Sequence, residues 1–504
     1  MAGIGFVLRE LDRRDTLFGT AWSAGHGMIV AAGPWIFTVV SLALIHRGSS
    51  GALTTSDGYN FRSFIMYAFA ISLFATAPAV NVSVRLASND MYRHSFTKVR
   101  SRFLASLAVG SLLSAGAALA LHMLVFKLAP YDLIIAVGST AAISLIWPTL
   151  AFCGAVRDYR GITAGFAVGL LVSIVGTIWV ARHGMGTPVM IVMFLCGLSI
   201  VFFVLASRIF LAFPDQMGSL GEQLAELGAG LRQHWMLAAG SFFSIAAVWS
   251  DKWIMWFGPG QVRLSNGLVS APAYDSAMFL AYLVMIPALG LFVTAIETSF
   301  FENSRQLLDS IEAQAPLSRI EKLAKKLETQ TYGTIYRVLL TLGALCALAI
   351  LLSPSTVSWL GLHYSQLGVY RLGILSAFFQ FMFVACASIV LFLDRQTMFL
   401  GLQILFFAAQ IIFTLVSIYF GQIYYGYGHL IACALCAVTA MFFLESTLGR
   451  IVYLTFASAH RATNGRNADV QSPAKVPRHF EDFREQEEIL PATLMTQPGP
   501  LLRP

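Results

Sequence analysis

Long runs of apolar residues recur along this chain of 504 residues, and polar segments separate them. A helix that crosses a bilayer needs about 20 mostly apolar residues. Because lipid offers no water to backbone N–H and C=O groups, each run predicts a helix. The approximate cores of about a dozen such runs are 26–46, 63–84, 103–126, 131–156, 161–181, 187–211, 234–257, 277–300, 335–352, 368–393, 397–420 and 427–447. The pattern predicts an all-α polytopic membrane protein with about 12 transmembrane helices.

The order of polar and apolar segments predicts two halves of six helices. Residues 26–211 hold the first six runs, residues 212–233 form a cytoplasmic linker, and residues 234–457 hold the second six. The Ala-Ala-Gly sequence that opens the first run, at 31–33, recurs at 238–240, where the seventh begins. Two pseudo-symmetric halves around a central cleft are typical of proteins that work by alternating access.

Three polar regions lie outside the predicted spans. Residues 1–25 predict an amphipathic segment on the inner leaflet. The stretch 302–334 predicts a cytoplasmic helix that docks a partner or lies on lipid, and Ser318 and Glu321 have capping-box spacing there. Residues 458–504 are rich in proline and charge, which predicts a disordered cytoplasmic tail.

Composition supports the membrane interpretation and sets an orientation. The chain is 57% hydrophobic and 12% charged, whereas a soluble domain has about 25% charged residues. If both termini are cytoplasmic, 26 of the 33 lysines and arginines lie inside and 6 outside, which satisfies the positive-inside rule. This asymmetry also accounts for the net charge of +7 without a nucleic-acid partner.

The sequence offers no enzyme motif. HExxH, GxxxxGK[ST] and GxSxG are all missing, and the ten histidines show no metal-ligand spacing within a span. The six cysteines fall within apolar runs, where small polarizable packing residues are expected. We therefore predict no catalytic residue, no metal and no cofactor.

One apolar run, Trp249–Gly260 (WSDKWIMWFGPG), holds both an aspartate and a lysine. Because adjacent helix residues point about 100° apart, Asp251 and Lys252 are not expected to neutralise each other, and Lys252 is expected to extend to the outer interface. Three interpretations stay open. Trp249, Trp253 and Trp256 form an interfacial belt, or they line a sugar path together with the charged pair, or a structural ion pair joins the two halves.

Four further ionisable residues are candidates for the substrate path. Asp275 fits a helix first turn, or a central cavity beyond a bend at Pro287. Glu297 ends the eighth run and fits either the cytoplasmic interface or the path. Arg85 and Arg157 mark cytoplasmic ends of spans, where they satisfy the positive-inside rule or hold an anionic headgroup or pyrophosphate.

Several segments resemble a known family. The N-terminal MAGIGF, the Gly33-Pro34-Trp35 sequence, WSDKWIMWFGP, YDSAMFLAYLVMIPALGLF and ETSFF are similar to the PelG-type subunit of the Pel exopolysaccharide system, over residues 1 to about 457. The resemblance implies the multidrug/oligosaccharidyl-lipid/polysaccharide flippase superfamily fold. It also implies export of an amino-sugar polymer for biofilm matrix across the inner membrane of a Gram-negative bacterium. The implied partners are membrane lipid, the polysaccharide chain, the subunits PelD and PelE, and the cytosolic glycosyltransferase PelF.

The sequence is also compatible with two rival functions. A cation-coupled small-molecule antiporter or a lipid-linked oligosaccharide flippase belongs to the same superfamily. Cation coupling would require a carboxylate deep in the first half, yet the first six runs hold essentially no aspartate or glutamate at mid-membrane. A non-transporting scaffold of a synthase complex would bury a dry core, whereas a translocase would leave a wet cleft.

Overall fold

A computed structural model describes residues 37, 39–49, 51, 55–92, 96–154, 159–213, 218–360 and 362–457. Residues 1–451 form one compact unit and residues 452–504 a second. In the described part of the first unit the regular structure is helical, apart from the short hairpin β1 (Val262–Arg263) and β2 (Val269–Ser270). The predicted all-α polytopic fold is confirmed.

Ten segments of the described chain are long and apolar enough to cross a membrane. Helix α10 (Trp235–Trp256) is not among the ten, although its 22 residues span about 33 Å at 1.5 Å per residue. Of the predicted first span 26–46, the structure describes Phe37 and the apolar helix Val39–Gly48, and the remaining residues of the span lie outside the described ranges. The N-terminal segment 1–25 and the tail 458–504 also lie outside them.

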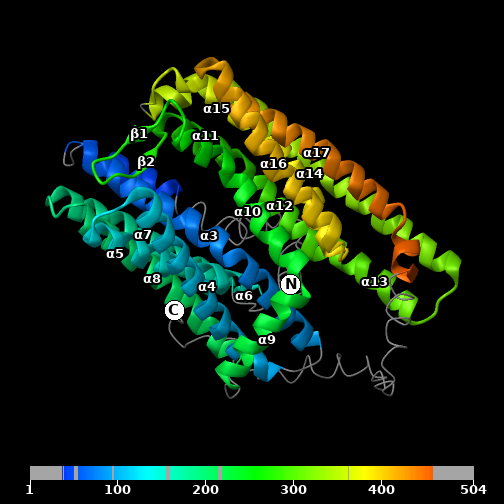
Figure 1. Cartoon of the computed structure of the whole chain (residues 1–504). Helices are drawn as coiled ribbons and strands as arrows, with labels where there is room; N and C mark the ends of the chain where they lie inside the picture. The colour runs from blue at the N-terminus through cyan, green and yellow to red at the C-terminus, as the bar shows by residue number, and fades with distance from the viewer. Residues whose placement is uncertain are drawn as a thin grey trace, which may run out of the picture. The chain divides into compact units, whose positions relative to one another are not determined.

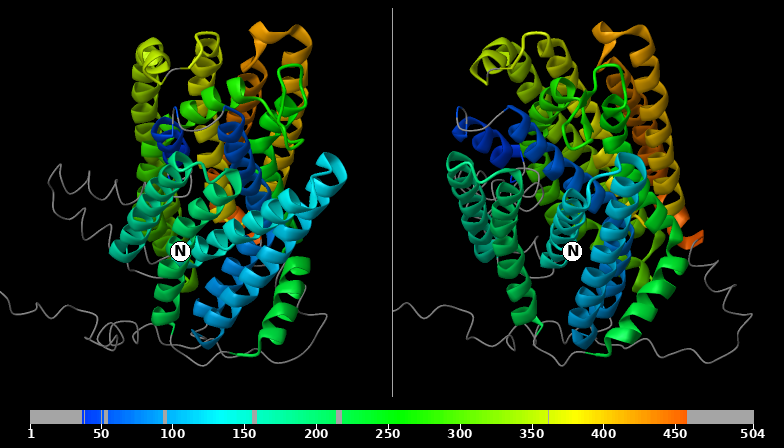
Figure 2. Two further views of the ribbon diagram at one scale, coloured as in Figure 1. Left: turned by 90° about the vertical axis from the view of Figure 1, so that its left-hand side faces the viewer. Right: turned by 60° about the vertical axis from the view of Figure 1, so that its left-hand side comes forward.

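The described helices form two sets by their packing contacts; in Figure 2 the first set runs from blue to green and the second from green to orange. In the first set, helix α3 lies against α4, α5, α6 and α8, while α7 pairs with α8. The first set comprises α3 (Thr55–Tyr92), η1 (Phe96–Lys98), α4 (Val99–Leu121), η2 (His122–Phe126), α5 (Pro130–Ser144), α6 (Ile146–Cys153), α7 (Tyr159–Arg182), α8 (Thr187–Ala212) and α9 (Leu220–Gln233).

Helix α15 holds a similar position in the second set, where it packs against α11, α14, α16 and α17. The second set comprises α10, β1 and β2, followed by α11 (Pro272–Tyr282), η3 (Leu283–Met285), α12 (Ile286–Ala295), η4 (Ile296–Phe300), α13 (Phe301–Glu312), α14 (Leu317–Trp359), α15 (Gln366–Phe392), α16 (Gln396–Phe420), η5 (Gln422–Tyr424) and α17 (Tyr427–Leu448).

Glycine allows the closest helix pair of the first set to form. A Cβ atom on Gly169 of α7 would lie 2.6 Å from the carbonyl oxygen of Gly197 in α8. The hydroxyl of Ser173 then donates a hydrogen bond of 2.8 Å to the Phe194 carbonyl across the same contact. Small residues that let backbones approach are a common means of joining helices in lipid, where apolar burial gives little driving force.

A seam between α3 and α10 joins the two sets, and these helices lie side by side in Figure 1. Along the seam, the Tyr67 ring packs on Trp256 with 4.5 Å between centroids, and the Tyr67 hydroxyl donates to the Val269 carbonyl at 2.8 Å. Further along α3, Phe74 packs edge-on against Trp253. Aromatic packing therefore fills the seam within the span.

Polar contacts mark the two ends of the seam. At the end near the hairpin, the Asn60 amide donates to the Ser265 hydroxyl at 3.1 Å. At the opposite end of α3, Arg85 pairs with Asp394 at 2.9 Å. Both contacts join the first set to the second, so each must break if the sets separate at that end.

Three predicted elements differ in the structure. The predicted span 131–156 is two helices, α5 and α6, which meet at Leu145. The span 277–300 is interrupted by η3 directly before Pro287, where the bend is predicted. The predicted cytoplasmic helix at 302–334 is instead α13 and the first part of α14, a helix of 43 residues that continues into the next span. Helix α14 begins after Pro316, so Ser318 lies inside the helix and no capping box forms.

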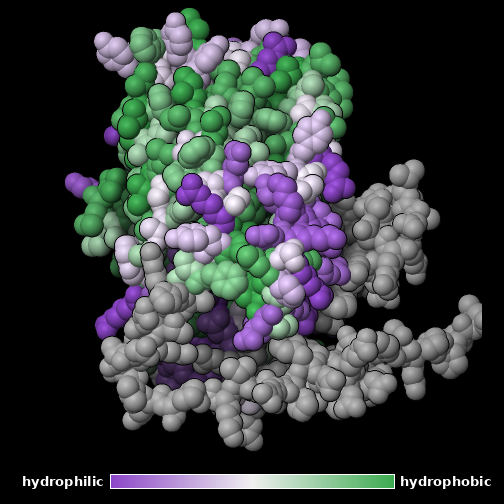
Figure 3. All heavy atoms as spheres, turned by 90° about the vertical axis from the view of Figure 1, so that its right-hand side faces the viewer, coloured by the Kyte–Doolittle hydropathy of each residue, from purple (hydrophilic) through white to green (hydrophobic). Residues whose placement is uncertain are grey.

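One face of the molecule has the exposed apolar surface that is expected of a protein in lipid. Figure 3 shows hydrophobic side chains covering the upper part of that face and hydrophilic ones gathered lower down. Helix α14 carries both kinds: Leu340 and Leu351 are exposed in its apolar part, and Lys325 and Glu328 pair in its polar part. An exposed apolar area of this extent is expected where lipid replaces water.

Candidate functional site

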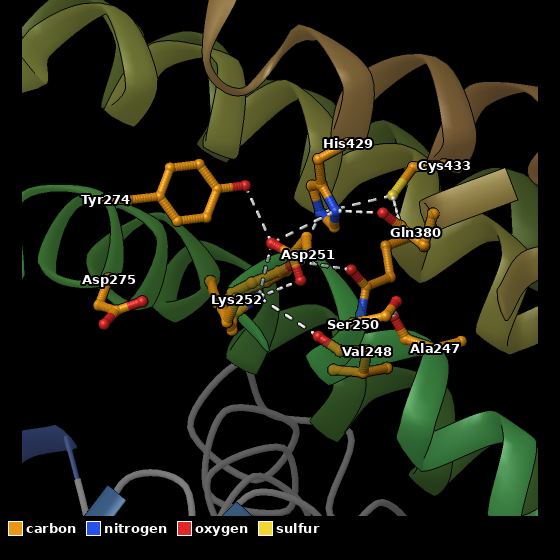
Figure 4. A network of polar contacts seen from close by, with 12 residues as sticks. Ala247, Val248, Ser250, Asp251, Lys252, Tyr274, Asp275, Gln380, His429 and Cys433 are labelled. Carbon is orange, nitrogen blue, oxygen red and sulfur yellow. Dashed lines mark hydrogen bonds and ion pairs between the residues drawn. The ribbon is translucent and has the colours of Figure 1, made fainter. Parts of the chain in front are cut away.

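Asp251 and Lys252 of α10 form a buried ion pair, which lies at the centre of Figure 4. The Lys252 ammonium donates to both carboxylate oxygens, at 2.9 and 3.0 Å, and the two side chains are 0% and 1% exposed. The prediction that the neighbours do not neutralise each other is therefore wrong, as is the prediction that Lys252 extends outward. The four-carbon stem of lysine is flexible enough to cover the 100° between the two positions. It bends back along the helix, because Nζ also donates to the Val248 carbonyl at 3.3 Å.

Two residues from other helices complete the surroundings of the Asp251 carboxylate. The Tyr274 hydroxyl of α11 donates to Oδ2 at 2.9 Å. His429 Nδ1 of α17 lies 3.7 Å from the same oxygen. On the other side, the Lys252 ammonium lies 5.0 Å from the centre of the Tyr282 ring, within reach of a cation–π interaction. Every buried charge in this group has partners, as burial in a low-dielectric interior requires.

His429 connects this group to two more helices, α15 and α16. Its Nε2 lies 2.6 Å from the Tyr282 hydroxyl, which is also 2.7 Å from Gln380 Oε1 of α15. Its Nδ1 lies 2.9 Å from Gln410 Oε1 of α16. We call Asp251, Lys252, Tyr274, Tyr282, Gln380, Gln410 and His429 the Asp251 cluster. The cluster joins α10, α11, α15, α16 and α17, so it fixes most of the second set around one polar centre.

Asp275 lies next to the Asp251 cluster and close to the seam. Its Oδ2 accepts a hydrogen bond of 2.8 Å from the Trp256 indole, and its side chain is buried. Its Oδ1 has no hydrogen-bond partner among the described residues. Trp256 in turn packs on Tyr67 of α3, so Trp256 connects Asp275 to the first set. Asp275 is also in the first turn of α11, as one of its two interpretations predicts.

The three tryptophans do not form a single strip. Trp249 and Trp256 are buried and contact each other, with 6.4 Å between ring centroids. Trp253 points instead at Phe74 of α3. Because Trp249 and Trp256 are 5% and 1% exposed, they do not form a belt at the lipid interface. Trp256 packs on Tyr67 in the seam, and Trp249 packs on Phe279 of α11.

The basic candidates lie elsewhere. Arg85 is at the end of the seam opposite the hairpin, half-buried, and paired with Asp394. Burial acts to raise the pKa of Asp394, but hydrogen bonds from Gln396 and Arg85 outweigh it and leave that pKa below the ordinary 3.8. Arg157 and the side chain of Glu297 lie outside the described residues. The structure thus brings Asp251, Lys252, Asp275 and the tryptophans together, and places Arg85 apart from them.

Sequence reasoning missed most of the Asp251 cluster. The residues predicted from the sequence are acidic, basic or tryptophan, and none is an uncharged polar residue of an apolar run. Gln380, Gln410 and His429 are single polar residues within otherwise apolar helices, and such residues are costly in lipid and face the bundle interior. That signal was available. The sequence gives no sign, however, of which of them meet.

The Asp251 cluster holds helices of the second set together through hydrogen bonds and an ion pair. Its charged groups are buried, and each Asp251 partner other than Lys252 comes from a different helix. In the part of the chain that the structure describes, no three His, Cys, Asp or Glu residues are grouped to hold a metal ion. A change of partner at Asp251 therefore requires α10 to move relative to α11 or α17.

Comparison with solved structures shows which known fold the chain shares. The fold is that of MATE-type transporters of the MOP superfamily. The match to a MATE structure in the bent conformation covers 90% of this chain and 99% of the MATE chain, with 13% identity and a TM-score of 0.56. An inward-facing multidrug resistance MATE transporter covers 83% and 96%, with 13% identity and a TM-score of 0.58. A MOP superfamily transporter from Pyrococcus furiosus covers 84% and 96%, with 13% identity and a TM-score of 0.55.

The chain belongs to the PelG family, described as "Putative exopolysaccharide Exporter (EPS-E)", whose family model matches residues 1–456. No curated protein matches the chain. Family and fold together support a membrane exporter or flippase, with the multi-pass helical character that the sequence predicts.

Proposed function

We propose that this protein exports an amino-sugar exopolysaccharide across the bacterial inner membrane, for use as biofilm matrix. The observation that carries the proposal is the match of the exopolysaccharide-exporter family to residues 1–456. The MATE-type fold supports it, because the structures of that fold include conformations named inward-facing and outward-facing. Proteins of this fold therefore open toward either side.

The seam between α3 and α10 suits such a motion. Among the described helices of the first set, α3 makes the extensive contact with the second, through α10, and the adjoining α9 makes only a small one. A single pair of helices can act as an axis about which two halves rock. The contacts Asn60–Ser265 and Arg85–Asp394 would then break alternately, each as the seam opens at its own end. In this proposal the Asp251 cluster keeps the second set rigid while it moves.

Orientation and partners belong to the same proposal. The distribution of lysine and arginine favours both termini in the cytoplasm, which places the hairpin and Asn60 on the outer side. The polymer would enter from the cytoplasmic side, where PelF makes it, with PelD and PelE as membrane partners. Arg85, at the inner end of the seam, is one basic residue that an arriving chain would meet.

A disulfide across the seam tests whether the two sets must move apart. Asn60→Cys with Ser265→Cys replaces a side-chain contact of 3.1 Å that lies on the oxidising side of the proposed topology. In cells that make the polymer, the oxidised double variant should secrete little of it, and a reductant should restore secretion. Secreted hexosamine polymer and the extent of cross-linking are measured in the same samples.

Gln366→Cys with Ser276→Cys is the matched control. These side chains are 2.8 Å apart, and both belong to the second set, so their disulfide should leave secretion unchanged. Normal secretion from the cross-linked Asn60/Ser265 variant would contradict the export motion and favour the scaffold function. Secretion that does not depend on this chain at all would reject the proposed function.

A further inference from the structure

A buried arginine ties helix α9, which connects the two sets, to the first set. Arg102 of α4 is 2% exposed, and its Nε donates a hydrogen bond of 2.9 Å to the carboxylate of Asp90 near the end of α3. Its Nη2 donates to the same carboxylate and, at 2.8 Å, to Glu226 of α9. The Lys98 ammonium pairs with Glu226 at 2.9 Å. Two acidic and two basic side chains from α3, η1, α4 and α9 thus form one electrically balanced group.

Apolar contacts hold the rest of α9 against the same set. Leu227 of α9 is 1% exposed and lies in one apolar cluster with Val82 and Leu86 of α3. A Cβ atom on Gly230 would lie 2.7 Å from the Leu86 side chain, so glycine lets the α9 backbone approach α3 this closely. Helix α10 contributes Leu237 to this cluster, from the first turn after α9. The extensive packing of α9 is therefore with α3 and α4, and its contact with α10 is small.

Helix α9 directly precedes α10 (Figure 1), but the two are not one continuous helix. His234 alone separates them, and its φ of −107° and ψ of 37° lie outside the helical region. His234 is close enough to Arg85 and Asp394 for both charges to act on its ring. The junction between α9 and α10 therefore lies at the inner end of the seam, where the ion pair of those two residues joins the sets.

The contacts of α9 decide with which set it moves. If α9 moved with α10, Glu226 would separate from Arg102, and the buried guanidinium would keep Asp90 as its one carboxylate partner. Taking a partner from a buried charge is strongly unfavourable. The close approach of Gly230 to α3 would open as well. A bend at His234 instead requires rotation only about the φ and ψ of a residue that is already non-helical.

We propose that α9 moves as part of the first set and that His234 is the hinge between the two sets at the inner end of the seam. Residues at the ends of helices commonly take up the φ and ψ changes of such motions. Opening of the inner end then changes the angle between α9 and α10, while the group around Arg102 stays intact. The inference rests on the proposed export function and adds to it the residue at which the chain bends.

Pairs of cysteines bridged by dibromobimane in polymer-producing cells test the inference. This reagent enters cells, joins two neighbouring thiols and becomes fluorescent when both have reacted. The background is full-length protein with Cys196→Ser, because Cys196 is the exposed cysteine and the other five are buried. Arg232→Cys with Trp235→Cys places one exposed thiol on each side of His234. The bridge should fix the junction, so secretion should fall in proportion to the bridged fraction, which the fluorescence of the recovered chain measures.

Two further pairs are the matched controls. Ala225→Cys with Ala229→Cys joins two exposed positions within α9, so its bridge should leave secretion unchanged. Lys98→Cys with Glu226→Cys joins α9 to the first set in place of the 2.9 Å ion pair. This bridge should also leave secretion unchanged, because the parts that it joins do not move relative to each other. For every pair, secretion from the same variant without the reagent is the reference, which removes any effect of the substitutions themselves.

Unchanged secretion after bridging across His234 would overturn the inference. Loss of secretion with the Lys98/Glu226 bridge would overturn it too, because α9 would then move relative to the first set. Loss with the bridge inside α9 would have the same result, since the effect would not be specific to the junction. If the seam disulfide blocks secretion and the bridge across His234 does not, this inference fails and the export function stands. Secretion that does not depend on the chain rejects the export function itself.

Discussion

Replacing Asp251 with asparagine should destabilise the protein more than any other single change in the Asp251 cluster. Asparagine has nearly the size of aspartate, so it leaves the packing of α10 intact. It removes the negative charge of the carboxylate, whose two oxygens accept hydrogen bonds from Lys252. The Lys252 ammonium is 1% exposed and cannot reach water without movement of the helix. The substitution therefore leaves a buried cation without its counter-charge.

The size of the effect follows from the geometry. Two unit charges 2.9 Å apart interact by about 6 kcal/mol at an effective dielectric constant of 20. Hydrogen bonds from Lys252 to the Val248 carbonyl and to the new amide oxygen recover part of this. Removing one partner of a buried pair typically costs about 3–5 kcal/mol, and we expect Asp251→Asn to fall in that range.

The assay is unfolding of the purified protein in mixed dodecyl maltoside and sodium dodecyl sulfate micelles. Wild type, Asp251→Asn, Lys252→Met and the double variant form a double-mutant cycle. The double variant removes both charges together, so it should be much more stable than the two single effects added together predict. Membrane abundance in cells gives a second, independent readout.

The outcome that refutes the reasoning is specific. If Asp251→Asn unfolds within about 1 kcal/mol of wild type, the charge is not held in a buried pair of the kind described. If the single effects simply add in the double variant, Asp251 and Lys252 do not interact. Normal stability with lost secretion would return Asp251 to a direct role in the substrate path.

Four other changes test the rest of the structure. Asp275→Asn should cost less than Asp251→Asn in the same assay, because its oxygen still accepts from the Trp256 indole and no buried cation loses a partner; equal costs would contradict this. Asp394→Asn breaks an exposed ion pair at the inner end of the seam, so its unfolding free energy should change by under about 1 kcal/mol. Gly169→Leu should abolish folding, because even a Cβ atom there meets the α8 backbone; correct folding in a fluorescence gel-filtration assay would refute that contact. A hydrogen bond from Lys98 holds the pKa of Glu226 below its ordinary 4.5, against the effect of burial, so its contribution to stability is present above pH 4.5 and is lost as the pH falls through the lower, folded-state value. The thermal midpoints of wild type and Glu226→Gln should therefore differ at neutral pH and converge in acid.

Apolar runs predict the helices well because lipid leaves so few alternatives. Nearly every predicted span that falls on described residues corresponds to a helix, and Asp251 and Lys252 could be singled out as charges within an apolar run. The pairing of the two could not be predicted from helix angles alone, because the direction of a Cα–Cβ bond does not limit where a long lysine side chain ends. The limits of α14 were missed for a related reason: a polar first part does not end a helix that continues into a span.

The partners of Asp251 show what a single sequence leaves open. Tyr274 is 23 residues away and His429 is 178 residues away. Hydropathy identifies both as parts of helices, but their meeting depends on how α10, α11 and α17 pack. Nothing in the local pattern around either residue specifies that packing.

The adjacency of Asp251 and Lys252 has a consequence for synthesis of the protein. Each charge alone at the centre of a helix costs about 2.5–3.5 kcal/mol at insertion. When α10 leaves the ribosome, His429 has not yet been made, and it follows 178 residues later. An aspartate that carries its counter-charge on the next residue can enter the bilayer as a neutral unit, without waiting for a partner from another helix. The later helices then assemble around a polar centre that is already electrically balanced.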